Sequence, residues 1–172
     1  MMHHTLIHLK EQKYMGISTK IYFREHNTID FKKLQQDVAR AGIANFDPGE
    51  RFLSMDSDFQ TDSFRYTPLV PVTAFEGDVF TRYLRPEGEY YCFEVSLTDL
   101  GPQWFQECYV YMERNRMHID HTFDLEYYPE DYLTALTSEG FRLQDQTISL
   151  LFRKVESGLD DEPVLEHLEE LE

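Results

Sequence analysis

The 172-residue sequence is poor in cysteine, tryptophan, basic side chains and long apolar runs. Its two cysteines, Cys92 and Cys108, are too few for a disulfide framework, so we expect two buried thiols in a reducing, cytoplasmic compartment. No segment approaches the roughly 18 consecutive apolar residues of a membrane-spanning helix. The polar, histidine-rich start also lacks the apolar stretch of a signal peptide. These absences predict a cytoplasmic protein with no membrane partner.

Basic residues are outnumbered: 16 Lys and Arg face 32 Asp and Glu, for a formal net charge of -16. This excess repels phosphate backbones and argues against direct binding of nucleic acid. It favours cationic ligands or a basic protein partner. Apolar residues make up 41% of the chain and aromatic residues 15%, which is enough to build the core of one domain.

The predicted elements of the first half come in the order strand, helix, strand, strand. They are an extended segment at residues 5–24, a helix after Asp30, and strands at 51–60 and 64–75. Gly16 interrupts the first segment, where we expect a bulge or a close backbone approach. Asp30 is the predicted N-cap of the helix and Gly42 its C-terminal stop. Pro68 and Pro71 predict an edge strand or an irregular one.

The second half repeats this order. Its elements are extended segments within 78–95, a helix from Gly101-Pro102, and strands at 121–128 and 146–155. We therefore predict an α+β fold of duplicated strand–helix–strand–strand modules. The domain would span residues 1–156, with halves at about 1–77 and 78–156, followed by an acidic tail or short helix at 157–172.

The tail at residues 157–172 contains seven acidic residues and no Lys or Arg. Its apolar residues fall on one side of a helical pattern, namely Val164, Leu165, Leu168 and Leu171. Two interpretations stay open. The segment docks on its own domain, or it binds a partner.

The strand predicted at residues 121–128 carries the first candidate site. Alternation places Phe123, Leu125 and Tyr127 on one face and Asp124, Glu126 and Tyr128 on the other. Glu126 and Tyr128 would then form an acid–phenol pair in the wall of a pocket. A carboxylate among aromatic rings attracts an organic cation by ion pairing and by cation–π contacts of about 0.5–2 kcal/mol each. The alternative is that this face meets solvent.

A second candidate face lies on the strand at residues 88–94, where Tyr90, Cys92 and Glu94 are co-facial. Tyr90 and Glu94 would join the same pocket if this strand neighbours the one at 121–128. The alternative is a half-buried strand with a wet face. Trp104, on the apolar face of the second predicted helix, completes the ligand-binding candidates.

Other site chemistries find less support. The two histidines within residues 118–121 have the wrong spacing for one helix face, and no distant Cys or His pair completes four zinc ligands. The sequence has no nucleophile elbow and no glycine-rich phosphate loop, and no motif implies a cofactor. A general acid–base mechanism that uses Glu94, Asp124 and Glu126 stays open.

Three short motifs resemble one known family. Residues 84–90, Leu-Arg-Pro-Glu-Gly-Glu-Tyr, resemble the P-x-G-x-Y strand entry of gyrase-inhibitory-protein-like domains, also called effector-binding domains. Residues 124–128 are similar to the late E-x-Y strand of that family, and Tyr14-Met15-Gly16-Ile17 to its first strand. The resemblance covers roughly residues 3–156.

This resemblance implies two similar units around a pseudo-twofold axis, an antiparallel sheet, and a ligand cleft between the halves. Family members attached to DNA-binding regions sense bulky lipophilic, often cationic compounds through a buried glutamate and aromatic side chains. Carried over, Glu126 is the matching acid, Tyr128 its co-facial phenol, and Tyr90 lies on the strand after the matching glycine. Stand-alone members include a gyrase inhibitor, drug-binding proteins and hydrolases of strained natural products.

Three functional hypotheses follow. The first is a stand-alone small-molecule-binding protein without catalysis or cofactor, whose aromatic, anionic pocket takes lipophilic or cationic compounds. Its ligand-binding candidates are Glu126, Tyr128, Tyr90, Glu94 and Trp104. The second is an acidic interaction protein, inhibitor or antitoxin-like, that covers a basic protein partner. The third is a hydrolase in which Glu126 activates water on a strained electrophile.

Overall fold

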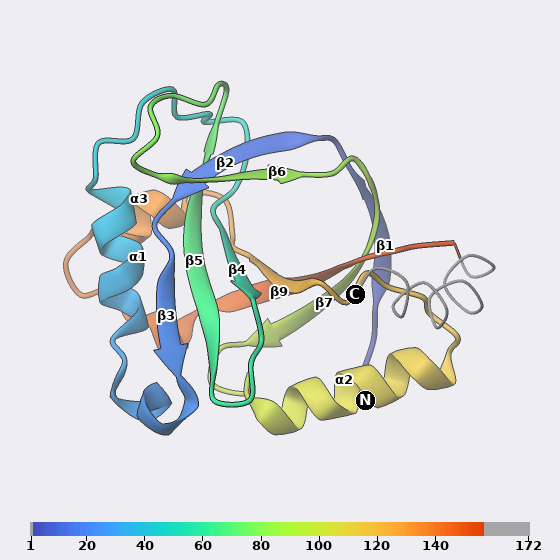
Figure 1. Ribbon diagram of the computed structural model, residues 1–172. Helices are drawn as coiled ribbons and strands as arrows, with labels where there is room; N and C mark the ends of the chain where they lie inside the picture. The colour runs from blue at the N-terminus through green and yellow to red at the C-terminus, as the bar shows by residue number, and fades with distance from the viewer. Residues whose placement is uncertain (1, 157–172) are drawn as a thin grey trace.

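Nine strands in the described part of the chain form one antiparallel sheet that curls into a half-barrel (Figure 1). The structure is a computed structural model and describes residues 2–156. The strands are β1 (Thr5–Leu9), β2 (Gln12–Gly16), β3 (Thr19–Tyr22), β4 (Leu53–Ser57), β5 (Ser63–Val72), β6 (Thr81–Arg85), β7 (Gly88–Ser96), β8 (Phe123–Tyr127) and β9 (Thr147–Arg153). The helical elements are η1 (Phe23–Thr28), α1 (Phe31–Ala39), α2 (Pro102–Arg114), α3 (Tyr132–Leu136) and η2 (Leu143–Asp145).

The sheet has the order β1-β7-β9-β8-β4-β5-β2-β6, with β3 paired to β5. Strand–helix–strand–strand occurs twice, which confirms the predicted α+β duplication. The two copies meet where β4 and β8 pair, with Met55 opposite Leu125 at the centre. Because this pair is antiparallel, a local twofold axis through it relates Asp56 to Glu126. The pseudo-twofold symmetry implied by the resemblance is therefore present.

The copies also exchange one strand each. β1, which leads into the first copy, pairs with β7 of the second. β6, which leads into the second copy, pairs with β2 of the first. The short connection from β6 to β7 therefore joins two strands that pair with different neighbours. This exchange ties the two halves into one sheet.

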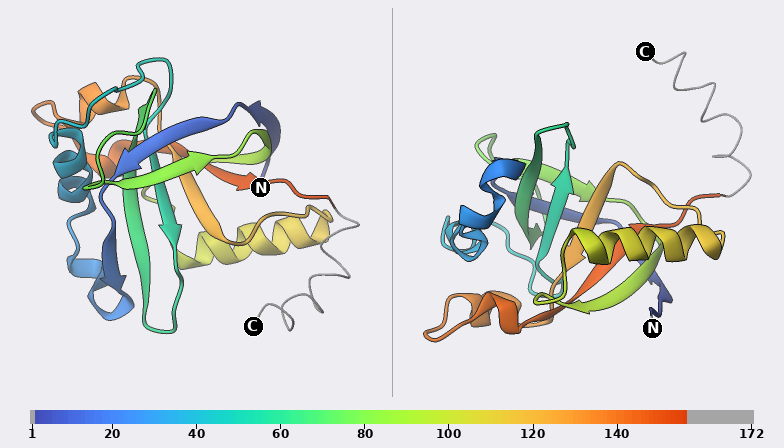
Figure 2. Two further views of the ribbon diagram at one scale, coloured as in Figure 1. Left: turned by 45° about the horizontal axis from the view of Figure 1, so that its top comes forward. Right: turned by 90° about the horizontal axis from the view of Figure 1, so that it is seen from below.

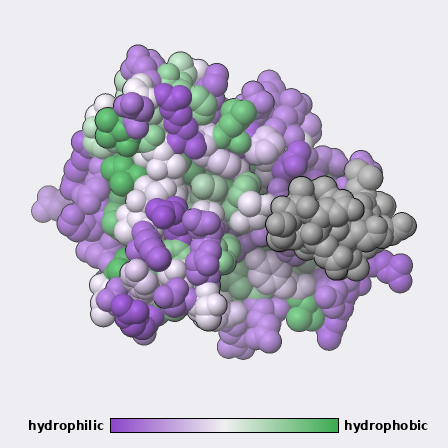
Figure 3. All heavy atoms as spheres, viewed as in Figure 1, coloured by the Kyte–Doolittle hydropathy of each residue, from purple (hydrophilic) through white to green (hydrophobic). Residues whose placement is uncertain are grey.

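Different sets of apolar side chains pack against the two faces of the sheet. The inner face of the curl carries an apolar cluster formed by Tyr14, Leu53, Leu69, Tyr90, Leu125, Tyr127 and Leu151. The outer face is covered by helices, with α1 beside β5 (Figures 1 and 2). A larger apolar cluster beneath the helices includes Phe93, Cys108, Met112, Leu150 and Phe152. The molecular surface seen from the side of Figure 1 is mostly hydrophilic, with scattered apolar residues (Figure 3).

The two helices predicted from the sequence, α1 and α2, begin where expected, whereas η1, α3 and η2 were not predicted. The Asp30 side chain accepts a hydrogen bond of 3.0 Å from the backbone N of Lys33 and so caps α1. Gly42 follows the helix with a φ of 73°, a left-handed conformation that glycine adopts without strain. Pro102 starts α2, whose buried side includes Cys108. Both thiols are free; Cys108 is buried, whereas Cys92 is only partly so.

The prediction that Pro68 and Pro71 make an edge strand is wrong, because β5 pairs with β4, β2 and β3. The backbone N of Asp47 donates to Pro71 O (2.9 Å), so the Pro71 nitrogen points away from β2. Backbone nitrogens alternate in direction along a strand, so the Pro68 nitrogen points to the side on which β2 and β3 lie. Neither strand pairs with Pro68, because the β3 pairing ends at Tyr66 and the β2 pairing starts at Leu69. Neither proline therefore removes a ladder hydrogen bond.

None of the helices in residues 2–156 is long and apolar enough to cross a membrane. Both interpretations of the acidic tail concern residues outside the described range.

We expect Gly16→Ala to destabilise the fold strongly. A Cβ atom at Gly16 would lie 1.9 Å from the backbone O of Pro68, where β2 ends against β5. Such overlap with backbone costs about 3 kcal/mol. Urea unfolding should therefore show a lower midpoint for this variant. Gly101→Ala is the matched control, since its Cβ would meet nothing within 4 Å; an equal loss in both variants would contradict the steric explanation.

Candidate functional site

Three carboxyl groups gather at the centre of the outer face. Asp56 comes from β4, and Asp124 and Glu126 come from β8. Asp56 lies directly opposite Asp124 in the ladder, and its carboxyl is close enough to Glu126 for the Glu126 charge to raise its pKa. Glu126 is only 8% exposed, whereas Asp56 and Asp124 are partly exposed. We call these three residues the acidic cluster.

Neighbouring hydroxyls hold the Glu126 carboxylate in place. Tyr128 OH donates to Glu126 Oε1 at 2.9 Å, and Ser54 Oγ donates to the same oxygen at 3.1 Å. Ser54 sits opposite Glu126 in the β4–β8 ladder, and both residues are buried. The predicted acid–phenol pair of Glu126 and Tyr128 is thus present, and the alternative of a solvent-facing strand is wrong for these two residues.

The phenol of Tyr128 is in turn fixed by α1. Gln35, which is buried on this helix, donates from Nε2 to Tyr128 OH (3.0 Å) and to Tyr66 OH (2.8 Å). Tyr132 of α3 donates to Gln35 Oε1 at 2.6 Å. A continuous hydrogen-bond network therefore runs from α3 through α1 to Glu126. Such a network restrains the carboxylate in a fixed orientation.

Burial and mutual repulsion shift the titration of the cluster. Burial raises the pKa of Asp56 well above its usual value, and the charge and hydrogen bond of Glu126 raise it further. Burial also raises the pKa of Asp124 to about 6; the hydrogen bond from Tyr109 opposes this shift and the Glu126 charge reinforces it. The acidic cluster therefore retains a proton at a pH where exposed carboxyls are ionised.

No Lys, Arg or His within residues 2–156 forms an ion pair with the acidic cluster. Other acids of the chain do find such partners; Glu50, for example, lies 3.0 Å from the guanidinium of Arg85. Negative charge held away from water is costly unless a cation or a proton neutralises it. In the described part of the chain, the raised pKa of Asp56 has the direction that such a cost produces.

Aromatic rings extend from the cluster toward α1. Tyr66 lies opposite Asp56 in the ladder and packs edge-on against Phe31, with centroids 4.9 Å apart. Phe64, two residues along the same strand face, stacks with Phe23 at 5.5 Å and with Phe59 at 6.1 Å. Phe23 and Phe59 are about half exposed. This aromatic patch therefore leads from the carboxylates to solvent.

On the α2 side, Tyr109 OH donates to Asp124 Oδ1 at 2.9 Å. Its ring stacks with Phe105 at 6.3 Å and meets Phe152 edge-on at 5.9 Å. Burial raises the pKa of the Tyr109 phenol, so the hydroxyl stays a donor. Aromatic side chains thus border the acidic cluster on both sides.

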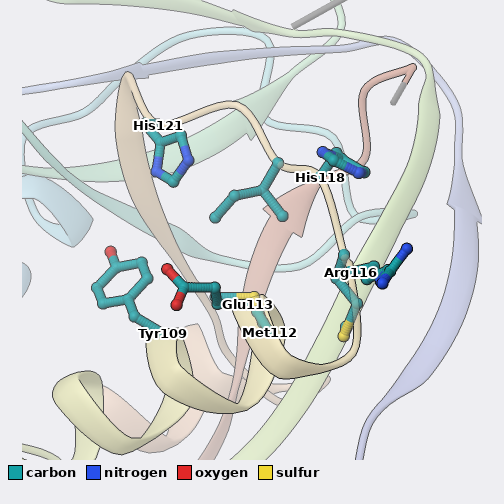
Figure 4. A pocket seen from close by; sticks show the side chains of 8 residues that line it. Tyr109, Met112, Glu113, Arg116, His118 and His121 are labelled. Atoms are coloured by element: carbon teal, nitrogen blue, oxygen red, sulfur yellow. The ribbon is translucent and has the colours of Figure 1, made fainter. Parts of the chain in front are cut away.

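A pocket of about 570 Å³ opens next to this side, between the end of α2 and the segment before β8 (Figure 4). Tyr109 lines it, together with residues of 112–121. A second pocket of about 400 Å³ lies along α2 near Gln106 and Val110. Glu126 lines neither of these two pockets.

The structure does not bring Tyr90 and Glu94 to the predicted site. β9 lies between β7 and β8, so the two strands are not neighbours. Phe93 pairs with Leu150, which pairs with Glu126, and these three therefore share the outer face. Tyr90 and Glu94 alternate with Phe93 and point to the opposite face. The expectation that they line a pocket together with Glu126 required β7 and β8 to be neighbouring strands, and they are not.

Trp104 lies on the helix-covered side, where its ring packs edge-on against Phe93 and Phe105. Sequence reasoning missed Asp56, Gln35 and Tyr109. Asp56 had a visible signal, because Ser54 and Asp56 alternate with apolar residues as Asp124 and Glu126 do in the second copy. Gln35 and Tyr109 had none, since a polar residue on an amphipathic helix is ordinarily assigned to solvent.

Among residues 2–156, no group of three or more His, Cys, Asp and Glu side chains is placed to hold a metal ion.

No family model matches the sequence, and no curated protein matches it either. Solved structures do match in fold. SAV2435, solved with tetraphenylphosphonium, has a TM-score of 0.58 at 15% identity over 94% of this chain and 98% of its own. The C-terminal domain of EcmrR has a TM-score of 0.57 at 11% identity over 90% and 98%. An integron cassette protein of Vibrio cholerae has 0.53 at 12% over 88% and 95%.

At these identities the likeness establishes the fold alone.

We expect two substitutions at the acidic cluster to shift the pKa of Asp124 in opposite directions. Tyr109→Phe removes the hydrogen bond that stabilises the charged form of Asp124, so the Asp124 pKa should rise above about 6. Glu126→Gln removes a neighbouring negative charge, so the Asp124 pKa should fall below about 6. Carbon-13 NMR titration of the aspartate carboxyls measures both. Shifts in the same direction would contradict the assigned contacts.

Proposed function

We propose that this protein binds a lipophilic organic cation at the acidic cluster. The observation that carries the proposal is the Glu126 carboxylate, which is buried and hydrogen-bonded yet has no cationic partner among residues 2–156. A bound cation would neutralise this charge.

The surroundings favour an organic cation over a small inorganic one. A hydrated metal ion needs several oxygen ligands in a defined geometry, and the cluster provides no such arrangement within the described residues. Aromatic rings on both sides supply apolar area and cation–π attraction of about 0.5–2 kcal/mol each. A ligand with delocalised charge and apolar substituents would use both features.

The partly exposed aspartates indicate how the ligand enters. Asp56 and Asp124 connect the buried Glu126 to solvent, and the half-exposed Phe23 and Phe59 lie at the outer end of the aromatic patch. The net charge of -16 would concentrate cations near the surface before contact. The tetraphenylphosphonium bound by SAV2435, which shares this fold, is a ligand of this chemical class.

The alternative of a basic protein partner rests on the net charge, and the alternative of hydrolysis rests on one carboxylate. The described residues add no observation that favours either. Binding of a cationic small molecule is therefore the function that the site supports best.

The direct test is calorimetric titration with tetraphenylphosphonium. We expect Glu126→Gln to weaken its binding by at least about tenfold, because the variant removes the buried charge that the cation neutralises. Glu94→Gln is the matched control, since Glu94 is exposed and lies on the opposite face; its affinity should equal that of the wild type.

Triphenylphosphine oxide, which is neutral and similarly aromatic, should bind much more weakly than the cation. Equal binding of both compounds, or equal affinity in wild type and Glu126→Gln, would contradict the proposal. So would the absence of binding by the wild-type protein.

The affinity should also depend on pH in a defined direction. The cation competes with protons for the acidic cluster, and the pKa of Asp124 is about 6. Affinity for tetraphenylphosphonium should therefore rise as the pH increases from about 5 to 7.5. Titrations in buffers of different ionisation enthalpy would detect the released proton. An affinity that falls over this range would show that the cluster is not the binding site.

A further inference from the structure

The pocket of about 570 Å³ at the end of α2 has a lining that is unusual for so acidic a protein. The lining combines apolar side chains with basic ones, namely Met112, Met117, Ile119, Arg116, His118 and His121. Glu113 also lines the pocket (Figure 4). Arg116 and His121 are exposed, while Met112 and Ile119 are buried beneath them. The chemistry fits an occupant with both carboxylates and apolar side chains.

The described chain ends next to this pocket. The backbone N of Val155 donates to His118 O at 3.0 Å, and Lys154 forms an antiparallel bridge with Ile119. The chain therefore passes beside two lining residues just before residue 156. Sixteen residues follow it in the sequence. Fully extended, they span up to about 50 Å, which is ample to reach every part of the pocket.

We propose that residues 157–172 bind in this pocket of their own chain. The segment carries seven acidic residues and no Lys or Arg, which complements Arg116 and the two histidines. Its apolar residues, Val164, Leu165, Leu168 and Leu171, match the apolar part of the lining. Because the segment is tethered beside its site, its high effective concentration makes individually weak contacts sufficient. The proposal is independent of the proposed function.

Limited proteolysis of the full chain with a glutamyl endopeptidase tests this interaction. The protease cleaves after glutamate, and the segment offers Glu166, Glu169 and Glu170. Cleavage requires the segment to leave the pocket, so its rate reports the unbound fraction. Arg116→Glu turns an attraction into a repulsion and should accelerate cleavage about fivefold. His121→Glu makes the same change at a second lining residue and should act in the same direction.

Arg114→Glu is the matched control. Arg114 is exposed on α2 and does not line this pocket, but its substitution changes the net charge equally. Its cleavage rate should stay within about twofold of the wild type. Equal rates in all four proteins would overturn the proposal, and so would an equal acceleration by Arg114→Glu. Protection that grows with protein concentration would identify the segment of a second copy as the occupant and would also overturn it.

Discussion

The structure depends on the antiparallel pairing of β4 with β8. This pairing joins the two copies of the strand–helix–strand–strand unit, and its register decides which side chains meet at the centre. It places Asp56 opposite Asp124 and Ser54 opposite Glu126. Like charges in directly opposed positions destabilise a sheet. Around Glu126, the hydroxyls of Ser54 and Tyr128 and the Gln35 network compensate for this arrangement.

The same symmetry explains why the acidic cluster is shared between the copies. The twofold axis relates Asp56 to Glu126, so each copy contributes one carboxyl to this electrostatically coupled pair. The copies differ around this pair. Gln35 and Tyr132 fix the Glu126 side, whereas Tyr109 fixes Asp124. A duplicated unit has thus diverged into one buried acid held by a network and two partly buried acids beside it.

The wrong predictions concern which strands lie next to each other more than whether a strand forms. Alternation in residues 121–128 placed Glu126 and Tyr128 on one face correctly, because side-chain direction in a strand follows from the backbone alone. Adjacency of β7 and β8 does not follow from the backbone, and β9 separates them. Pro68 was misread for a similar reason: whether a missing amide matters depends on which strands lie beside it, and here the ladder is interrupted at that point.

The amino-acid sequence by itself determined the strand–helix–strand–strand order of each half, the starts of α1 and α2, and which side chains of β7 and β8 share a face, because these depend on contacts between residues close along the chain. Only the tertiary structure decided which acids meet. Asp56 and Glu126 are 70 positions apart, and nothing local links them. Their contact arises from the register of one strand pair, and the burial that raises the pKa of Asp56 exists only once two helices and a curled sheet have packed around it.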